Sequence, residues 1–181
     1  FDGDGGTVYN YSGVTVQNLP YEGSCIVMNP SMTTPEITDS QAPHGGDQYL
    51  AIFNSVPSTI VSGSTTNDWV ISPALTNPTS LTFWARELTD QYGPEVLRIM
   101  YSTTTNDVSE FEMAQQLNIT TTDWTEYTFE LPAEAKYVAF NCISNDVFAL
   151  FIDDVTIASA RNRDAQIVKY NVYRSADPET G

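Results

Sequence analysis

Two adjacent carboxylates stand inside an apolar segment late in the chain. The segment FALFIDDVTIAS, residues 148–159, places Asp153 and Asp154 between β-branched and aromatic residues, a composition typical of a buried strand. Successive side chains of a strand face opposite sides. If the Asp153 side faces the core, its carboxylate points inward. If Ile152 faces the core instead, the strand must bulge at the pair to bring Ile157 back to the same side.

An inward carboxylate needs a compensating partner, because burying it alone costs several kcal/mol. Protonation, hydrogen bonds or a bound cation would each provide one. The chain has 23 acidic and 7 basic residues, a net charge of −16. In a chain this acidic, Ca²⁺ is the simplest partner, since it takes about six to eight oxygen ligands. The alternative is that Asp153 caps backbone amides at a bulge.

The same acidity limits the classes of partner. A net charge of −16 repels nucleic acid phosphates and anionic membranes, so we expect no nucleic acid binding. No run of eighteen or more apolar residues occurs, which predicts no membrane insertion. The length of 181 residues suits one domain with a full hydrophobic core.

Basic residues concentrate near the end of the given sequence. Four of the seven lie within its last 21 residues, namely Arg161, Arg163, Lys169 and Arg174. This shift predicts a domain over residues 1–158. Residues 159–181 are then a basic linker that leads into IVKYNVYRS, which alternates like the opening strand of a fibronectin type III-like module.

The remaining residues with catalytic potential are sparse. His44 is the single histidine, and its spacing to Cys25, Cys142 or any serine supports no nucleophile–base arrangement. We therefore expect no enzyme activity. The two cysteines leave two possibilities open, namely one disulfide in an oxidising compartment or two buried thiols.

The elements that position these residues are β-strands. Short segments rich in Val, Ile, Thr, Tyr, Phe and Trp alternate with clusters of Pro, Gly, Asn and Asp, which is typical of a two-sheet sandwich. Residues 21–46 hold three prolines, which predicts a long surface excursion after a short strand at SCIVM, while residues 109–117 fit either a helical turn or a strand. The further predicted strands cover residues 7–12, 48–54, 80–87, 95–103, 125–131, 136–144 and 149–158.

Five segments of this all-β chain together resemble one family. They are DWVISPAL (68–75), LTFWAR (81–86), LRIMYSTTTNDVSEF (97–111), WTEYTFELP (124–132) and KYVAFNCISNDVFALFIDDVTI (136–157). In order and spacing they resemble the cleaved adhesin domain, also called the choice-of-anchor J type, over residues 1 to about 157. The resemblance implies a jelly-roll β-sandwich of two antiparallel sheets, galactose-binding-like or MAM-like. It also implies a secreted or cell-surface protein of Bacteroidota in which this domain binds without catalysis.

The resemblance also implies a calcium ligand set. Carried over to this sequence, the ligands are Asp2, Asp47 and Asp153, completed by main-chain carbonyls. Alternation in SLTFWARE places Trp84 and Arg86 on the side opposite Phe83, a pair suited to stacking on and hydrogen-bonding a sugar.

The expected partner of such a module is an extracellular protein or glycan, together with neighbouring domains of the same polypeptide. Tyr92, in the polar loop LTDQYGPE, is the exposed aromatic candidate for ligand contact. The alternative function is a carbohydrate-binding accessory module of a secreted glycoside hydrolase or protease.

Overall fold

The computed structural model describes residues 6–8, 15–16, 25–34, 36–37, 41–53, 55–57, 66–145 and 147–160. For residues 6–8, 15–16, 34 and 55–57 the backbone alone is described. Asp2 and the predicted linker and fibronectin-like segment after residue 160 lie outside the described residues. Within the described part of the chain, no helix has the length and apolar character needed to cross a membrane.

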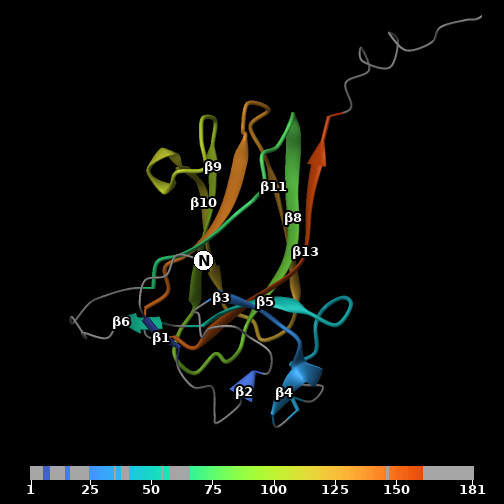
Figure 1. Ribbon diagram of the computed structural model, residues 1–181, viewed down its shortest axis with the longest axis vertical. Helices are drawn as coiled ribbons and strands as arrows, with labels where there is room; N and C mark the ends of the chain where they lie inside the picture. Colours follow the sequence, from blue (N-terminus) through green and yellow to red (C-terminus); the bar gives the residue numbers. More distant parts are fainter. Residues whose placement is uncertain are drawn as a thin grey trace, which may run out of the picture.

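Two antiparallel sheets form the body of the molecule (Figure 1). The five-stranded sheet has the order β11 (Thr125–Glu130), β8 (Pro78–Glu87), β13 (Ala149–Ser159), β5 (Tyr49–Phe53), β3 (Cys25–Met28). The four-stranded sheet has the order β10 (Glu112–Ile119), β9 (Glu95–Ser102), β12 (Tyr137–Cys142), β7 (Asp68–Ile71). The sandwich predicted from the sequence is therefore confirmed.

Short elements complete the fold. Two-stranded pairings join β1 (Gly6–Val8) to β6 (Ser55–Pro57) and β2 (Thr15–Val16) to β4 (Thr33–Thr34). The described residues also include the 3₁₀ helices η2 (Pro30–Met32) and η4 (Val108–Glu110). The ambiguous segment 109–117 is thus mostly strand β10. Most of its side chains are exposed at the sheet edge, so it lacks the alternation that marks a half-buried strand.

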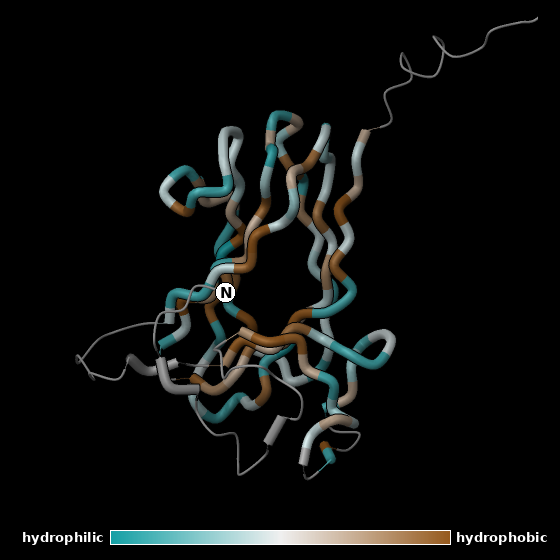
Figure 2. Tube along the Cα trace, viewed as in Figure 1, coloured by the Kyte–Doolittle hydropathy of each residue, from teal (hydrophilic) through white to brown (hydrophobic). Residues whose placement is uncertain are grey.

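The main core lies between the two sheets. Leu81, Phe83 and Ala85 of β8 point inward as the alternation predicts, and the Phe83 ring meets the Phe140 ring at a centroid distance of 4.8 Å. Both cysteines are buried thiols and form no disulfide, the second of the two possibilities left open by the sequence. Figure 2 shows hydrophobic residues along the strands of both layers.

A second, smaller cluster covers the outer face of the five-stranded sheet. Ile37 and Trp124 pack against it, so the excursion between β3 and β5 covers part of this sheet rather than standing free. Its buried members are Ile26, Met28, Tyr49, Ala51, Phe53, Ala149 and Phe151. This outer cluster borders the acidic pair of β13.

Candidate functional site

Strand β13 contains a bulge at the aspartate pair. Asp153 is opposite Trp84 on β8, whereas Thr156 is opposite Thr82, so β13 holds one more residue than its partner over this stretch. The extra residue sits at Asp154, whose φ of 47° lies in the left-handed region. Aspartate is one of the few residues other than glycine that is enriched in this region, and a bulge bends its strand locally.

The bulge decides which of the two predicted arrangements occurs. Ile152 is in the core between the sheets, and Ile157 packs against the same core beyond the bulge. Asp153 therefore lies on the outer face of the five-stranded sheet, beside Trp84. Of the two arrangements left open by the sequence, the bulged one is correct.

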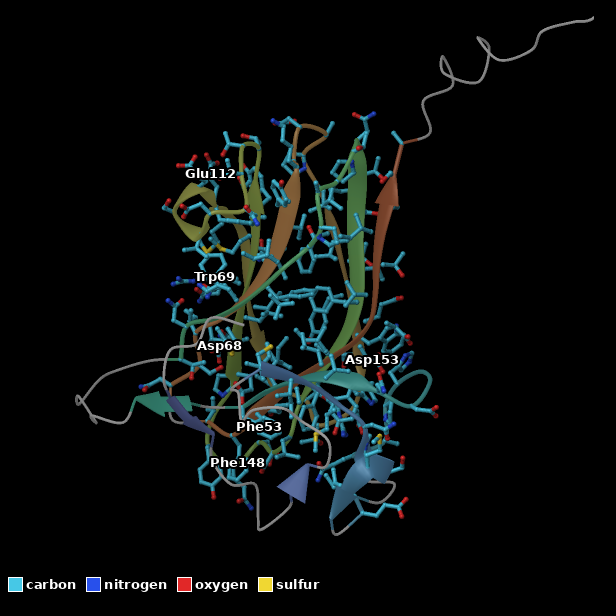
Figure 3. The ribbon with its side chains drawn as sticks, in the orientation of Figure 1. Phe53, Asp68, Trp69, Glu112, Phe148 and Asp153 are labelled. Carbon is cyan, nitrogen blue, oxygen red and sulfur yellow. The ribbon has the colours of Figure 1, made fainter. Side chains whose placement is uncertain are left out.

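Asp153 is buried by a loop, not by the core. Residues 41–46, which we call the covering loop, cross the outer face ahead of β5, and Figure 3 shows Asp153 beside this part of the chain. Oδ2 of Asp153 accepts the backbone N–H groups of His44 at 2.8 Å and Gly45 at 3.1 Å. Oδ1 accepts the N–H of Asp154 at 2.8 Å. The residue is only 9% exposed, so three amide dipoles compensate its charge in place of water.

The neighbouring Asp154 holds the covering loop by its side chain. Its Oδ2 lies 2.7 Å from Nδ1 of His44. The His44 ring stacks on Trp84 at a centroid distance of 3.8 Å and an interplanar angle of 14°. Trp124 adds a hydrogen bond from Nε1 to the carbonyl of Ala42 at 3.0 Å. The imidazole is thus engaged in positioning the loop.

Arg86 lies on the outer face, as predicted, but inside a cover of aromatic rings. Its guanidinium carbon is 5.0 Å from the Trp124 ring centroid and 5.3 Å from that of Phe151. Nη1 donates to the carbonyl of Thr122 at 3.0 Å, and the residue is 8% exposed. The structure places Trp84 and Arg86 on one sheet face, and their contacts described here are intramolecular. Their contact with a ligand stays a prediction.

Tyr92 stands apart from this cluster, in the loop between β8 and β9. It is 56% exposed and stacks on Phe148 at a centroid distance of 5.9 Å. Gly93 follows with a φ of 96°, a conformation that glycine adopts without strain. The loop therefore presents an aromatic surface to solvent.

The predicted calcium ligands are not assembled by the described residues alone. Asp47 is exposed, Asp153 is occupied by amide donors, and Asp2 lies outside the described residues. Among the residues the structure describes, no three or more His, Cys, Asp or Glu side chains converge to hold a metal. The predicted calcium site would need Asp2 and main-chain oxygens to complete it, and it stays a prediction.

Gly45 packs closely against the Asp154 side chain, with no room for a Cβ unless that side chain moves. A Cβ at this position would lie 2.6 Å from Oδ2 and 2.8 Å from Oδ1 of Asp154. We expect Gly45→Ala to push the carboxylate away from His44 and to lower the free energy of unfolding by about 1 kcal/mol. Chemical denaturation measures this change.

A double-mutant cycle checks the cause. In an Asp154→Ala background the clash is gone, so Gly45→Ala should have little further effect. Gly46→Ala is the matched control, because Gly46 has a φ of 61° and no neighbour within 4 Å of an added Cβ. Gly46→Ala should lower the free energy of unfolding by the same amount in the wild type and in the Asp154→Ala background. Additive effects of Gly45→Ala and Asp154→Ala would contradict the proposed clash.

The fold defines a two-sheet antiparallel β-sandwich domain. Residues 31–157 match the family described as the Cleaved Adhesin Domain. The chain belongs to the cleaved adhesin domain family. This confirms the resemblance read from its sequence motifs.

Individual relatives agree with this assignment. Lys-gingipain W83 of Porphyromonas gingivalis is 30% identical over 129 aligned residues, covering 60% of this chain and 7% of the relative. Hemagglutinin A of strain W83 is also 30% identical over 129 residues, covering 60% of this chain and 6% of its own length. The chain therefore spans a small fraction of these long polypeptides.

Solved structures agree on the fold. The K1 cleaved adhesin domain of Lys-gingipain from P. gingivalis W83 superposes with a TM-score of 0.59 at 22% identity, covering 82% of this chain and 98% of that domain. The K3 domain of the same protein gives a TM-score of 0.57 at 25% identity, covering 77% and 93%. The jelly-roll sandwich expected from the sequence is confirmed.

Proposed function

We propose that the chain is an adhesion module of a longer secreted or cell-surface polypeptide and binds an extracellular protein or glycan through the loop that carries Tyr92. The family supports a binding role, and its members in gingipains and hemagglutinin A are parts of long polypeptides. The observation that carries the proposed surface is the exposed stack of Tyr92 on Phe148.

Tyr92 is the best placed residue for a ligand. Among the described residues, it is the only aromatic in the set of exposed large hydrophobic side chains. Tyrosine combines a large apolar face with a hydroxyl group and is enriched at interface hot spots. Loops on a rigid sandwich are also where binding residues concentrate. Trp84 and Arg86 can take part in ligand recognition only if the covering loop leaves their side chains accessible to the ligand.

The test is a binding screen with a matched pair of variants. A glycan array and a panel of extracellular matrix proteins identify a ligand for the wild type. Tyr92→Ala should then weaken binding about 30-fold or more, with little change in melting temperature because the side chain is exposed. Val108→Ala, which shortens another exposed apolar side chain in the 3₁₀ helix η4, should bind like the wild type.

The outcomes separate the two ligand classes. Binding to array glycans that Tyr92→Ala abolishes would favour the carbohydrate-binding alternative. Binding to proteins alone would favour an adhesin. Full binding by Tyr92→Ala would reject the proposed surface, and a wild type that binds neither class would leave a structural spacer as the better description.

We also propose that Ca²⁺ stabilises the module through Asp2, Asp47 and Asp153. The net charge of −16 and the paired aspartates of β13 support a cation in this region. We expect EDTA to lower the melting temperature of the wild type by several degrees, because a ligand bound to the native state stabilises it. In the Asp153→Ala variant, EDTA should no longer cause the part of this fall in melting temperature that is due to calcium at the proposed site. Identical wild-type melting curves with and without EDTA would reject calcium stabilisation.

A further inference from the structure

Two glutamates face the interior of the sandwich from opposite sheets. On β8 the inward row Leu81, Phe83 and Ala85 continues to Glu87, which lies opposite the buried Leu150. On β9 the inward row begins with Glu95, opposite the buried Ile119. Glu87 and Glu95 are only 2% and 3% exposed. The strand pattern thus brings two carboxyl groups to one end of the core.

Each of these two carboxyl groups has one buried oxygen atom without a hydrogen-bond partner among the described residues. The backbone amide of Glu95 is near enough to the Glu87 carboxyl group to lower its pKa, although burial raises the pKa of Glu87 more strongly. The Ser144 hydroxyl donates to Oε2 of Glu95 and accepts the N–H of Val96 at 2.8 Å. The other oxygens, Oε2 of Glu87 and Oε1 of Glu95, have no hydrogen-bond partner among the described residues.

Further charges near the pair are negative. The charge of Asp90 contributes to the raised pKa of Glu87. The charges of Glu95 and Asp68 contribute to the raised pKa of the buried Cys142 thiol. The arginines nearest to the two glutamates in sequence lie on the outer faces of the sheets. The Arg86 guanidinium stacks over the Trp124 ring, and Nε of Arg98 donates to Oε1 of Gln116. Two ionised carboxylates at this position would be expensive unless a positive charge joined them.

The geometry points to a binding site for a Ca²⁺-class divalent cation between the two sheets, with Glu87, Glu95 and Ser144 as its side-chain ligands. A charge of +2 neutralises the two carboxylates. The donors are hard oxygens, which suit Ca²⁺ rather than a soft metal. Because the described residues bring no third carboxylate, thiol or imidazole to the site, main-chain carbonyls or water would complete the coordination.

Other ions fit this position less well. Mg²⁺ requires a regular octahedron and keeps several waters, whereas the pair is flanked by the buried apolar residues Leu97 and Leu150. Zn²⁺ prefers thiolates and imidazoles, and burial raises the pKa of Cys142 to about 12, which keeps the thiol protonated. Ca²⁺ accepts irregular sets of oxygen ligands.

This site is separate from Asp153. Asp153 lies on the outer face of the five-stranded sheet, whereas Glu87 and Glu95 lie between the sheets. Figure 3 shows Asp68 and Asp153 on different sides of the molecule, and Asp68 is opposite Cys142 at the same end of the core as Glu95. The two calcium proposals can therefore be tested independently.

The experiment measures calcium binding and melting temperature in metal-depleted protein titrated with CaCl₂. The Asp153→Asn variant should still bind Ca²⁺ and still gain several degrees at a hundredfold excess over the Kd. In that background, Glu95→Gln and Glu87→Gln should each lower the affinity at least tenfold and remove the gain. Glu130→Gln, at an exposed position of β11, is the matched control for charge and should respond like its parent.

Several results would overturn the inference. Asp153→Asn protein that binds no Ca²⁺ would assign all binding to the outer site. An unchanged calcium response in both glutamine variants would show that the pair holds no cation. Should one glutamine variant fail to fold, the other variant and the calcium content of Asp153→Asn protein after gel filtration still decide the question.

Discussion

Replacing Asp153 with alanine is expected to lower the free energy of unfolding by about 3 kcal/mol, even when calcium is absent. The carboxylate accepts backbone N–H groups from His44, Gly45 and Asp154, and the residue is almost fully buried. Alanine removes the acceptor and leaves three donors that must find water or stay unpaired. For a domain of this size the change corresponds to a fall in melting temperature of about 6–12 °C.

Two variants define the cause of this loss. Asp153→Asn keeps one carbonyl oxygen and should retain part of the stability. Asp154→Ala removes the exposed contact with His44 but none of the three amide bonds, so it should cost much less than Asp153→Ala. Equal losses in Asp153→Ala and Asp154→Ala, measured in EDTA by chemical denaturation, would show that the amide bonds do not stabilise the fold.

The position of the aspartate pair shows what could be predicted from sequence. Period-two alternation limited the pair to two arrangements, because Ile152 and Ile157 share a side only if the strand bulges. Alternation could not identify the donors. The amides of His44 and Gly45 are more than 100 residues away in sequence, and only the folded covering loop brings them to β13. Long-range contacts of this kind leave no local signal.

The cluster around Trp84 shows a similar limit. Alternation correctly placed Trp84 and Arg86 on the face opposite Phe83. The same pattern says nothing about what covers that face, which here is the His44 ring and Trp124. The cover depends on how a long proline-rich excursion folds back, and propensities of single residues do not specify such a path.

The positions of the buried glutamates are encoded in the alternation of their strands. The inward row of β8 runs through every second residue, Leu81, Phe83 and Ala85, and the next position in that row is Glu87. Glu95 likewise precedes Leu97 and Ile99 in the inward row of β9. Following each alternation to the end of its strand predicts two inward acids.

The second large effect expected is a pH dependence of stability that Glu95 produces in metal-depleted protein. Burial raises the pKa of Glu95 from its ordinary value of 4.5 to about 7; the hydrogen bond from Ser144 opposes the rise and the charge of Glu87 adds to it. Because the folded state binds this proton more tightly than the unfolded state, the contribution is complete below pH 4.5 and is lost as the pH rises through about 7. The loss amounts to about 3 kcal/mol.

Glu95→Gln isolates this contribution, since glutamine stays neutral throughout the range and keeps an oxygen for Ser144. The free energy of unfolding of the variant, relative to the wild type, should rise by about 3 kcal/mol between pH 5 and pH 8. Acids that do not interact with Glu95 titrate equally in both proteins and cancel, and Glu130→Gln should show no such trend because its side chain is exposed. Urea denaturation at the two pH values, without metal, provides the comparison. A constant difference between wild type and Glu95→Gln would mean that Glu95 is ionised at little cost, and the buried pair would then already have a partner other than a proton or a cation.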